Sequence, residues 1–211
     1  MKSKKNLLEQ LKTLPHFNKN AVYQLGKQLG LKDSTVDTYI SRFLKYNEIF
    51  QLKNGLYVTS AFYDKYKHDG SYSFYLANII RVPSYISSWA ALQYYGLATE
   101  SINSITSVTI KVTKDYQAKA GNFAYQSIKK ELFSDFHLVT GRPGSDAGGF
   151  DFFIASPAKA LFDLLYFRTR QFRGIKLEDI DPMIEELRID FDEMDIEEQE
   201  KFYSFVKNIL I

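Results

Sequence analysis

The sequence of 211 residues contains no cysteine and only three histidines. Without cysteine the protein cannot form disulfides, bind a metal through thiolates or use a thiol nucleophile. The three histidines, His16, His68 and His137, are far apart, and none belongs to an H-E-x-x-H or H-x-E motif. The G-x-S-x-G motif of serine hydrolases is also missing. We therefore expect no catalytic residue, no metal and no cofactor, although an active site assembled from distant residues leaves no local motif.

Long apolar segments are missing as well. No apolar run approaches the roughly 20 residues that span a bilayer. The basic N-terminus, residues 1–6, is followed by amphipathic sequence rather than by the apolar core of a signal peptide. We expect a soluble, cytoplasmic protein without a membrane partner. The hydrophobic content of 45%, with 17 Phe and 15 Tyr, allows one or two domains with aromatic cores.

Charge is unevenly distributed along the chain. Residues 1–60 hold ten Lys or Arg against four Asp or Glu, a net charge of +6. The rest of the chain holds 17 basic against 21 acidic side chains, a net charge of −4. A basic block beside an acidic block suggests that only the first one faces a polyanion such as DNA.

Two helices are predicted before residue 30. Leucines at helical spacing predict one over residues 3–13, which Pro15 ends. A second is expected over residues 21–29, with Asn20 as its N-cap. Gly30 follows, where a helix C-terminus favours a residue of positive φ. The turn leads directly into a third helix, which is the spacing of a helix-turn-helix.

The third helix, expected over residues 33–45, is amphipathic. Asp33 or Ser34 can cap it, and Ser34 with Asp37 fits the S/T-x-x-D/E start signal. Its apolar face is formed by Val36, Ile40, Phe43 and Leu44. The opposite face is short, polar and basic, without a central carboxylate, and consists of Ser34, Thr35, Thr38, Ser41, Arg42 and Lys45. Such a face suits a helix that contacts DNA, although an ordinary surface helix shows the same pattern.

A β-hairpin is predicted directly after this helix. Two β-prone runs, residues 48–52 and 56–59, flank Lys53-Asn54-Gly55, and Asn-Gly is the strongest local hairpin signal. In this position the hairpin is the wing of a winged helix, where Lys53 and Asn54 can reach a phosphate or the minor groove. The alternative is a hairpin that only covers the small core. The order of these elements favours a winged helix-turn-helix DNA-binding domain over residues 1–60.

A connector over residues 61–70 and a second domain over residues 71–211 are expected next. The second domain is predicted to be mixed α/β with a helical C-terminal end, so the whole chain is α+β. Helices are expected over residues 73–80, 88–95 and from Ser156-Pro157 to 167. Strands are expected over residues 105–113, 122–128, 136–140 and 150–155. In the first of these, Val108, Ile110 and Val112 alternate with polar residues, which predicts a half-buried strand.

Three segments of the second domain leave alternatives open. The glycine-rich residues 141–149 lack a G-K-[S/T] ending, so we expect a hairpin loop rather than a phosphate site. Arg168, Arg170 and Arg173 follow an apolar helix and suit its C-terminal dipole better than a second nucleic-acid patch. Residues 178–200 hold twelve acidic side chains and one basic one. A solvated helical face explains them, and a docking surface for a basic partner is the alternative.

The order of several short motifs resembles a known family. After the helix-turn-helix come Gly-Leu-Tyr at 55–57, Pro-Ser-Tyr-Ile-Ser at 83–87, and Tyr-Gly-Leu at 95–97. Residues 155–165 then read A-S-P-A-K-A-L-F-D-L-L. Over about residues 5–170 this order resembles the AbiEi-type antitoxins and related transcriptional regulators. One departure is Ala158, where family members often carry Glu.

The resemblance implies an antitoxin of a type IV toxin–antitoxin system, a system of phage defence, with a nucleotidyltransferase-like toxin as its functional partner. In that family the winged helix represses its own promoter by binding repeated operator sequences in double-stranded DNA. The second domain counters the toxin, without a stable complex between the two proteins.

We therefore expect a DNA-binding regulator rather than an enzyme. Base edges are assigned to Ser34, Thr35, Thr38 and Arg42, phosphates to Ser41 and Lys45, and the tip of the wing to Lys53 and Asn54. Arg42 is the best candidate for a bidentate contact with guanine. The alternatives are a standalone winged-helix regulator, a module that neutralises a protein partner directly, and an enzyme acting on nucleic acid. The last would need a polar cluster in the second domain.

Overall fold

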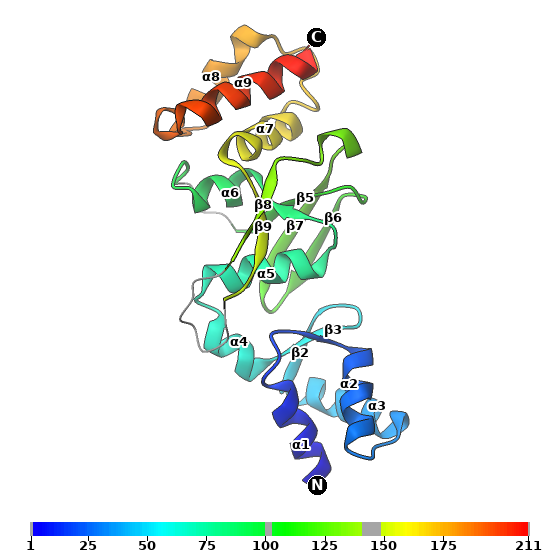
Figure 1. Ribbon diagram of the computed structural model, residues 1–211. Helices are drawn as coiled ribbons and strands as arrows, with labels where there is room; N and C mark the ends of the chain where they lie inside the picture. Colours follow the sequence, from blue (N-terminus) through cyan, green and yellow to red (C-terminus); the bar gives the residue numbers. More distant parts are fainter. Residues whose placement is uncertain (1, 100–102, 141–148, 211) are drawn as a thin grey trace. The chain divides into compact units, whose positions relative to one another are not determined.

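The computed structural model describes residues 2–99, 103–140 and 149–210 (Figure 1). The chain divides into two compact units. The first comprises residues 1–73 with 116–121, and the second comprises residues 74–115 with 122–211. Both contain helices and strands, so the expected α+β fold is confirmed. Among the described residues, no helix combines the length and apolar character needed to cross a membrane.

The first unit begins with three helices and a small antiparallel sheet. Its elements are α1 (Lys2–Leu11), β1 (Phe17–Asn18), α2 (Lys19–Gln28), α3 (Asp33–Lys45), β2 (Ile49–Lys53), β3 (Leu56–Thr59) and α4 (Ser60–Tyr66). The strand order is β1-β3-β2. The predicted hairpin is confirmed, because β2 and β3 pair across the Asn54-Gly55 turn with Phe50 opposite Val58.

Helices and sheet of this unit share one apolar core. Helices α1, α2 and α3 contribute residues at helical spacing, and the strands contribute their inward side chains. The fully buried members include Leu7, Leu11, Val22, Val36 and Phe43. The sequence pattern predicted these positions because one face of each helix is continuously apolar.

The turn between α2 and α3 follows the rules of helix termination. Gly30 has φ 69°, as predicted. Its neighbour Leu31 donates its N–H to the carbonyl of Gly26 at 2.9 Å, which closes a Schellman motif. Asn47 takes the equivalent place after α3, with φ 54°. These two turns define where α3 begins and ends.

The start of α2 differs from the expectation. Asn20 is not its cap; Asn18 is, and its Oδ1 accepts the N–H of Ala21 at 2.9 Å. The helix begins earlier because β1 ends at Asn18, which places that residue in the extended conformation that an N-cap requires.

Most of the segment expected to connect the domains is helical. In α4, the Oγ1 of Thr59 accepts the N–H of Phe62 at 3.2 Å. Phe62 and Tyr66 lie one turn apart, and their rings pack against Tyr72 at centroid distances of 5.6 and 6.1 Å. Aromatic burial therefore extends the first unit beyond residue 60.

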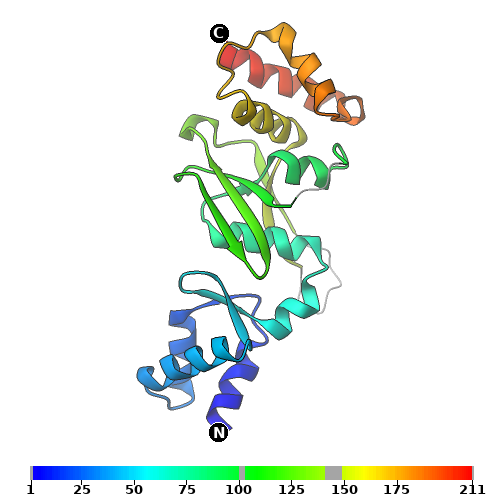
Figure 2. The same ribbon diagram turned by 180° about the vertical axis from the view of Figure 1, so that it is seen from behind.

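The second unit is built on a mixed sheet of order β6-β7-β5-β4-β9-β8, of which residues 116–121, the end of β6 and the turn into β7, are grouped with the first unit. Its strands are β4 (Tyr85–Ile86), β5 (Ile105–Thr109), β6 (Lys114–Ala118), β7 (Gly121–Ser127), β8 (Phe136–Val139) and β9 (Phe152–Ala155). Pairs β4–β9 and β5–β7 are parallel, whereas β4–β5 and β8–β9 are antiparallel. Seen from behind in Figure 2, the β6–β7 hairpin lies at one edge of this sheet.

Helices precede and follow the strands. They are α5 (Gly70–Ile80), α6 (Ser88–Tyr94), α7 (Pro157–Arg168), α8 (Ile180–Glu186) and α9 (Ile196–Leu210), with short 3-10 helices η1 (Lys130–Leu132), η2 (Leu177–Asp179) and η3 (Phe191–Glu193). Helix α7 packs between α6 and α9 (Figure 1). The predicted helices of this unit are thereby confirmed, with small shifts of their ends.

Three strands are close to their predicted ranges, but the prediction for residues 105–113 is wrong in part. Strand β5 ends at Thr109, which is buried and donates its hydroxyl to the carbonyl of Pro83 at 2.6 Å. Ile110 and Val112 are exposed. The expected alternation fails because β5 is an inner strand with buried residues on both faces. Strands β4 and β6 were not predicted, and the loop expected over residues 141–149 lies outside the described residues except for residue 149.

Candidate nucleic-acid interface

Helix α3 has one buried and one exposed side, as its sequence predicts. Val36, Ile40 and Phe43 are buried and Leu44 is half-buried. On the other side Thr35 is half-buried, and the exposed residues are Ser34, Thr38, Ser41, Arg42 and Lys45. Arg42 and Lys45 lie in the last turn, where basic side chains also suit the helix dipole.

The beginning of α3 is less simple than its start signal suggests. Neither Asp33 nor Ser34 is the cap; the N-cap is Lys32, and no side chain makes a capping hydrogen bond. Asp33 instead lies in the first turn, where its charge favours the helix dipole. Thr38 donates its hydroxyl to the carbonyl of Ser34 at 3.0 Å. Thr38 therefore presents an acceptor and a methyl group to a partner.

The one carboxylate in the middle of α3 is neutralised by α2. Asp37 Oδ1 lies 2.8 Å from Lys19 Nζ and accepts the hydroxyl of Tyr23 at 2.7 Å. The hydrogen bond from Lys19, and to a smaller extent the one from Tyr23, lowers the pKa of Asp37. Lys19 also lies 5.3 Å from the centroid of the Tyr23 ring. This network joins the two helices and removes a negative charge that would repel phosphate.

Further ion pairs account for most of the remaining acidic side chains in the first unit's helices and turns. Lys4 pairs with Glu48 at 3.3 Å, and Lys12 pairs with Glu9 at 2.9 Å. Among the residues that the structure describes, the exposed cations of α2, the turn and α3 that form no ion pair are Lys27, Lys32, Arg42 and Lys45. The α2–turn–α3 segment, residues 19–45, holds five basic against two acidic side chains, a net charge of +3 and half of the +6 over residues 1–60.

The tip of the β2–β3 hairpin has the conformation that its sequence predicts. Gly55 has φ 75°, and Lys53 pairs with Leu56 across the turn. Asn54 is exposed, whereas Lys53 is half-buried. Their contact with DNA stays a prediction.

The second unit contains a buried ion pair that sequence reasoning missed. Lys159 and Asp163 lie one turn apart on α7, with Nζ 2.5 Å from Oδ1, and are 2% and 0% exposed. The other carboxylate oxygen accepts hydroxyls from Ser87 at 2.7 Å and Tyr85 at 3.0 Å. Burial raises the pKa of Asp163, and the ammonium of Lys159 opposes this rise. Because the cluster is closed to solvent, it suits a structural role and not a substrate site.

This ion pair joins two of the motifs identified in the sequence. Tyr85 and Ser87 belong to the Pro-Ser-Tyr-Ile-Ser segment at 83–87, and Lys159 and Asp163 belong to the segment at 155–165. The two segments are more than 70 residues apart, so no local pattern could have indicated their contact.

The first turn of α7 is held by α9, a helix later in the chain that packs against α7. Ser156 caps the helix, and the N–H of Ala158 donates to Glu198 of α9 at 2.9 Å. Lys201 of α9 pairs with Glu198 at 3.2 Å and with Asp135 at 2.6 Å. At least one acidic side chain of the C-terminal part therefore stabilises the fold instead of covering a solvated face.

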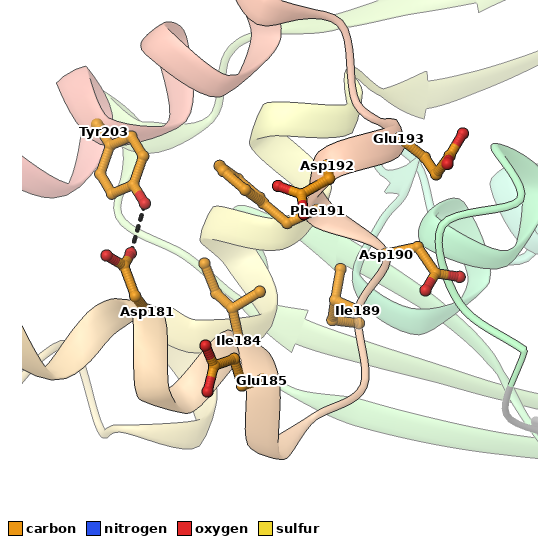
Figure 3. Close-up of a pocket in the computed structure, with 9 residues that line it drawn as sticks. All are labelled: Asp181, Ile184, Glu185, Ile189, Asp190, Phe191, Asp192, Glu193 and Tyr203. Carbon is orange, nitrogen blue, oxygen red and sulfur yellow. Dashed lines mark hydrogen bonds between the residues drawn. The ribbon is translucent and has the colours of Figure 1, made fainter.

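An acidic groove of about 510 Å³ lies among α8, η3 and α9 (Figure 3). Three apolar residues, Ile184, Ile189 and Phe191, contribute to its lining. Its carboxylates are Asp181, Glu185, Asp190, Asp192 and Glu193. Tyr203 donates its hydroxyl to Asp181, which Figure 3 marks with a dashed line. Within the described ranges no group of His, Asp or Glu is close enough to hold a metal ion. The groove can attract a cationic group by its charge alone.

Comparison with known proteins adds no family assignment. The chain matches none of the protein-family models, and no curated protein matches it either.

Proposed function

We propose that this protein is a DNA-binding transcriptional regulator whose first unit is a winged helix-turn-helix. The observation that carries the proposal is the charge of α3 and its preceding turn. Among the residues that the structure describes, three exposed cations there, Lys32, Arg42 and Lys45, form no ion pair, and neither does Lys27 at the end of α2. Asp37, in the middle of α3, is neutralised by Lys19. Unpaired cations around an exposed polar helix face are what a phosphate backbone requires.

In the proposed complex α3 enters the major groove. Base edges are contacted by Ser34, Thr35, Thr38 and Arg42, phosphates by Ser41 and Lys45, and the flanking backbone or minor groove by Lys53 and Asn54. The half-burial of Thr35 places it at the margin of this surface. Thr38 offers its methyl group and an acceptor, which suit a thymine methyl or an amino group of a base.

We further propose that the regulator is a cytoplasmic autorepressor and the antitoxin of a type IV system, countering a nucleotidyltransferase-like toxin without a stable complex. The order of the short motifs supports this, and two of these motifs meet at the Lys159–Asp163 ion pair. Co-expression with the neighbouring gene is the test. The antitoxin role requires that this gene encode a nucleotidyltransferase-like protein whose toxicity the chain relieves. A neighbour of another kind leaves a standalone regulator as the function.

Arg42→Ala is expected to weaken specific DNA binding by about 1–3 kcal/mol and to relax sequence preference. The cause is the loss of a guanidinium that donates two parallel hydrogen bonds to guanine. The measurement is a gel-shift titration on the DNA upstream of the protein's own gene, beside a scrambled duplex of equal length.

Arg42→Lys is the matched control for this substitution. It keeps the charge but loses the planar fork, so binding to the scrambled duplex should be retained while the preference for the operator falls. If Arg42→Ala binds the operator with the affinity of the unmodified protein, α3 does not contact the bases as proposed.

Lys45→Ala should weaken binding to both duplexes by a similar factor. Because Lys45 is assigned to a phosphate, the slope of log K against log salt should decrease in magnitude by about 1. Lys207→Ala removes the same charge from an exposed position on α9 and should leave the slope unchanged. A slope that changes equally in both variants would argue for a general effect of net charge.

A second candidate function is an interaction module that neutralises a basic protein partner directly. The acidic groove of Figure 3 favours it, because five of the nine residues that line the groove carry carboxylates. Stable co-purification with the product of the neighbouring gene, lost at high salt, would support this function over a DNA-centred one.

A further inference from the structure

A second concavity of the second unit differs from the acidic groove in chemistry. It has a volume of about 450 Å³ and lies between the end of α5, the segment after it, and strands β8 and β9. Its walls are almost entirely apolar and include Phe133, Phe136, Phe153, Ile79, Val82 and Leu138. This volume is within the range of about 300–1,000 Å³ that small-molecule sites occupy.

The rings of this cavity form a preorganised aromatic wall. Phe136 is edge-to-face with Phe133 at 5.1 Å and with Phe153 at 5.8 Å, and it stacks on Tyr85 at 4.6 Å. Such an arrangement fixes the ring orientations before a ligand arrives. A flat apolar molecule can therefore pack against this wall without a large rearrangement.

Apolar side chains are also unusually exposed at the cavity. Val82, Leu138 and Phe153 are 60%, 50% and 43% exposed, although each is a large apolar residue. All three line the same cavity. Scattered exposed apolar residues are common, but a cluster around one concavity indicates a surface that a ligand covers.

Two buried polar groups at the cavity have no partner within the described structure. Asn78 accepts the N–H of Phe153 with its Oδ1 at 2.6 Å, but its Nδ2 makes no hydrogen bond. The hydroxyl of Ser84 is also unpartnered, and both residues are at least nine-tenths buried. Buried donors are nearly always satisfied, so these two require an explanation. Both atoms are closed to solvent, so an accepting oxygen on a ligand provides it when the two side chains turn towards the cavity.

We propose that this cavity binds a neutral, planar, apolar molecule that carries one hydrogen-bond-accepting oxygen. The aromatic wall selects the apolar body, and the amide of Asn78 and the hydroxyl of Ser84 select the oxygen. The carboxyl group of Asp151, which also lines the cavity, disfavours an anionic ligand. The site lies in the second unit and does not depend on the proposed DNA binding.

The test uses 6-propionyl-2-(dimethylamino)naphthalene, a neutral aromatic ketone whose emission shifts to the blue in apolar surroundings. The full chain should bind it saturably with such a shift. 2-(Dimethylamino)naphthalene, which lacks the carbonyl group, should bind at least several-fold more weakly. Absence of a saturable blue shift, or equal binding of the two compounds, would overturn the proposal.

Substitutions locate the site. Val82→Glu places a carboxylate in the wall of the cavity at an exposed position and should weaken ketone binding at least 10-fold. Val112→Glu is the control, since Val112 is 76% exposed in the same unit and does not line the cavity. Leu138→Glu gives a second, independent variant with the expectation of Val82→Glu, and circular dichroism verifies folding. Unchanged binding in a folded Val82→Glu or Leu138→Glu protein would show that the ketone binds elsewhere.

Ser84→Ala separates a ligand contact from a packing role. Removing an unpartnered buried hydroxyl should raise the melting temperature of the free protein, while ketone affinity should fall by about 2- to 10-fold. A residue that acts only in packing would change the melting temperature and leave the affinity unaltered.

Discussion

Asp163→Ala is expected to destabilise the second unit by about 3–5 kcal/mol, because it leaves the ammonium of Lys159 buried without a counter-charge. It also removes the acceptor of the Tyr85 and Ser87 hydroxyls. Urea unfolding followed by tryptophan fluorescence measures this directly. The single tryptophan of the chain, Trp89, is in α6 of the same unit.

The double variant Lys159→Met with Asp163→Asn is the control for charge. It removes both charges but keeps an amide oxygen that can accept the two hydroxyls. Replacing a buried ion pair by neutral groups is often close to neutral in stability, so most of the lost free energy of unfolding should return. If the double variant unfolds as easily as Asp163→Ala, the loss reflects packing and not an unpaired charge.

Gly26→Leu is expected to destabilise the first unit by about 3 kcal/mol, the upper end of what overpacking costs. A Cβ added at Gly26 would lie 2.4 Å from Cγ2 of Val36, so the contact between α2 and α3 has no room even for a methyl group. Val36 is β-branched and has essentially one rotamer in a helix, which prevents it from moving aside. Urea unfolding followed by far-ultraviolet circular dichroism measures the change, and DNA binding should fall with it because α3 is displaced.

Gly30→Ala is the matched control, at the glycine of the turn that follows α2. Nothing lies within 4 Å of a Cβ built at Gly30, so only its positive φ is unfavourable to alanine. We expect a cost of about 1–2 kcal/mol, and Gly30→Asn should cost less, because Asn tolerates this conformation. A Gly26→Leu protein no less stable than Gly30→Ala would contradict the close contact between α2 and α3.

Features encoded by neighbouring residues were predictable from the sequence. The hairpin follows from Asn54-Gly55, the turn before α3 from Gly30, and the buried side of α3 from a 3.6-residue period. Each depends on residues within one or two turns of each other. The exposed candidate residues of α3 follow from the same period, since a buried side determines its opposite.

The missed features depend on residues that are distant in the sequence. Asp37 looks like an unpaired acid until the structure brings Lys19 beside it. The alternating pattern of residues 105–113 places Thr109 on an exposed face, but β5 lies inside the sheet and Thr109 is buried. Asn20 is a residue type that often caps helices, but the two-residue strand β1 ends at Asn18 and makes that residue the N-cap of α2. Tertiary contacts override local preference in all three cases.

The bond between Ala158 and Glu198 has a consequence for synthesis of the protein. The first turn of α7 receives its carboxylate from a residue 40 positions later, and the buried Phe202 and Val206 belong to that same helix α9. Chains emerge from the ribosome N-terminus first and fold in domains. Until α9 has been made, α7 therefore lacks both a hydrogen-bond partner and part of its apolar cover. A nascent chain stopped before residue 196 should be a substrate for chaperones, whereas the first unit is complete long before that point.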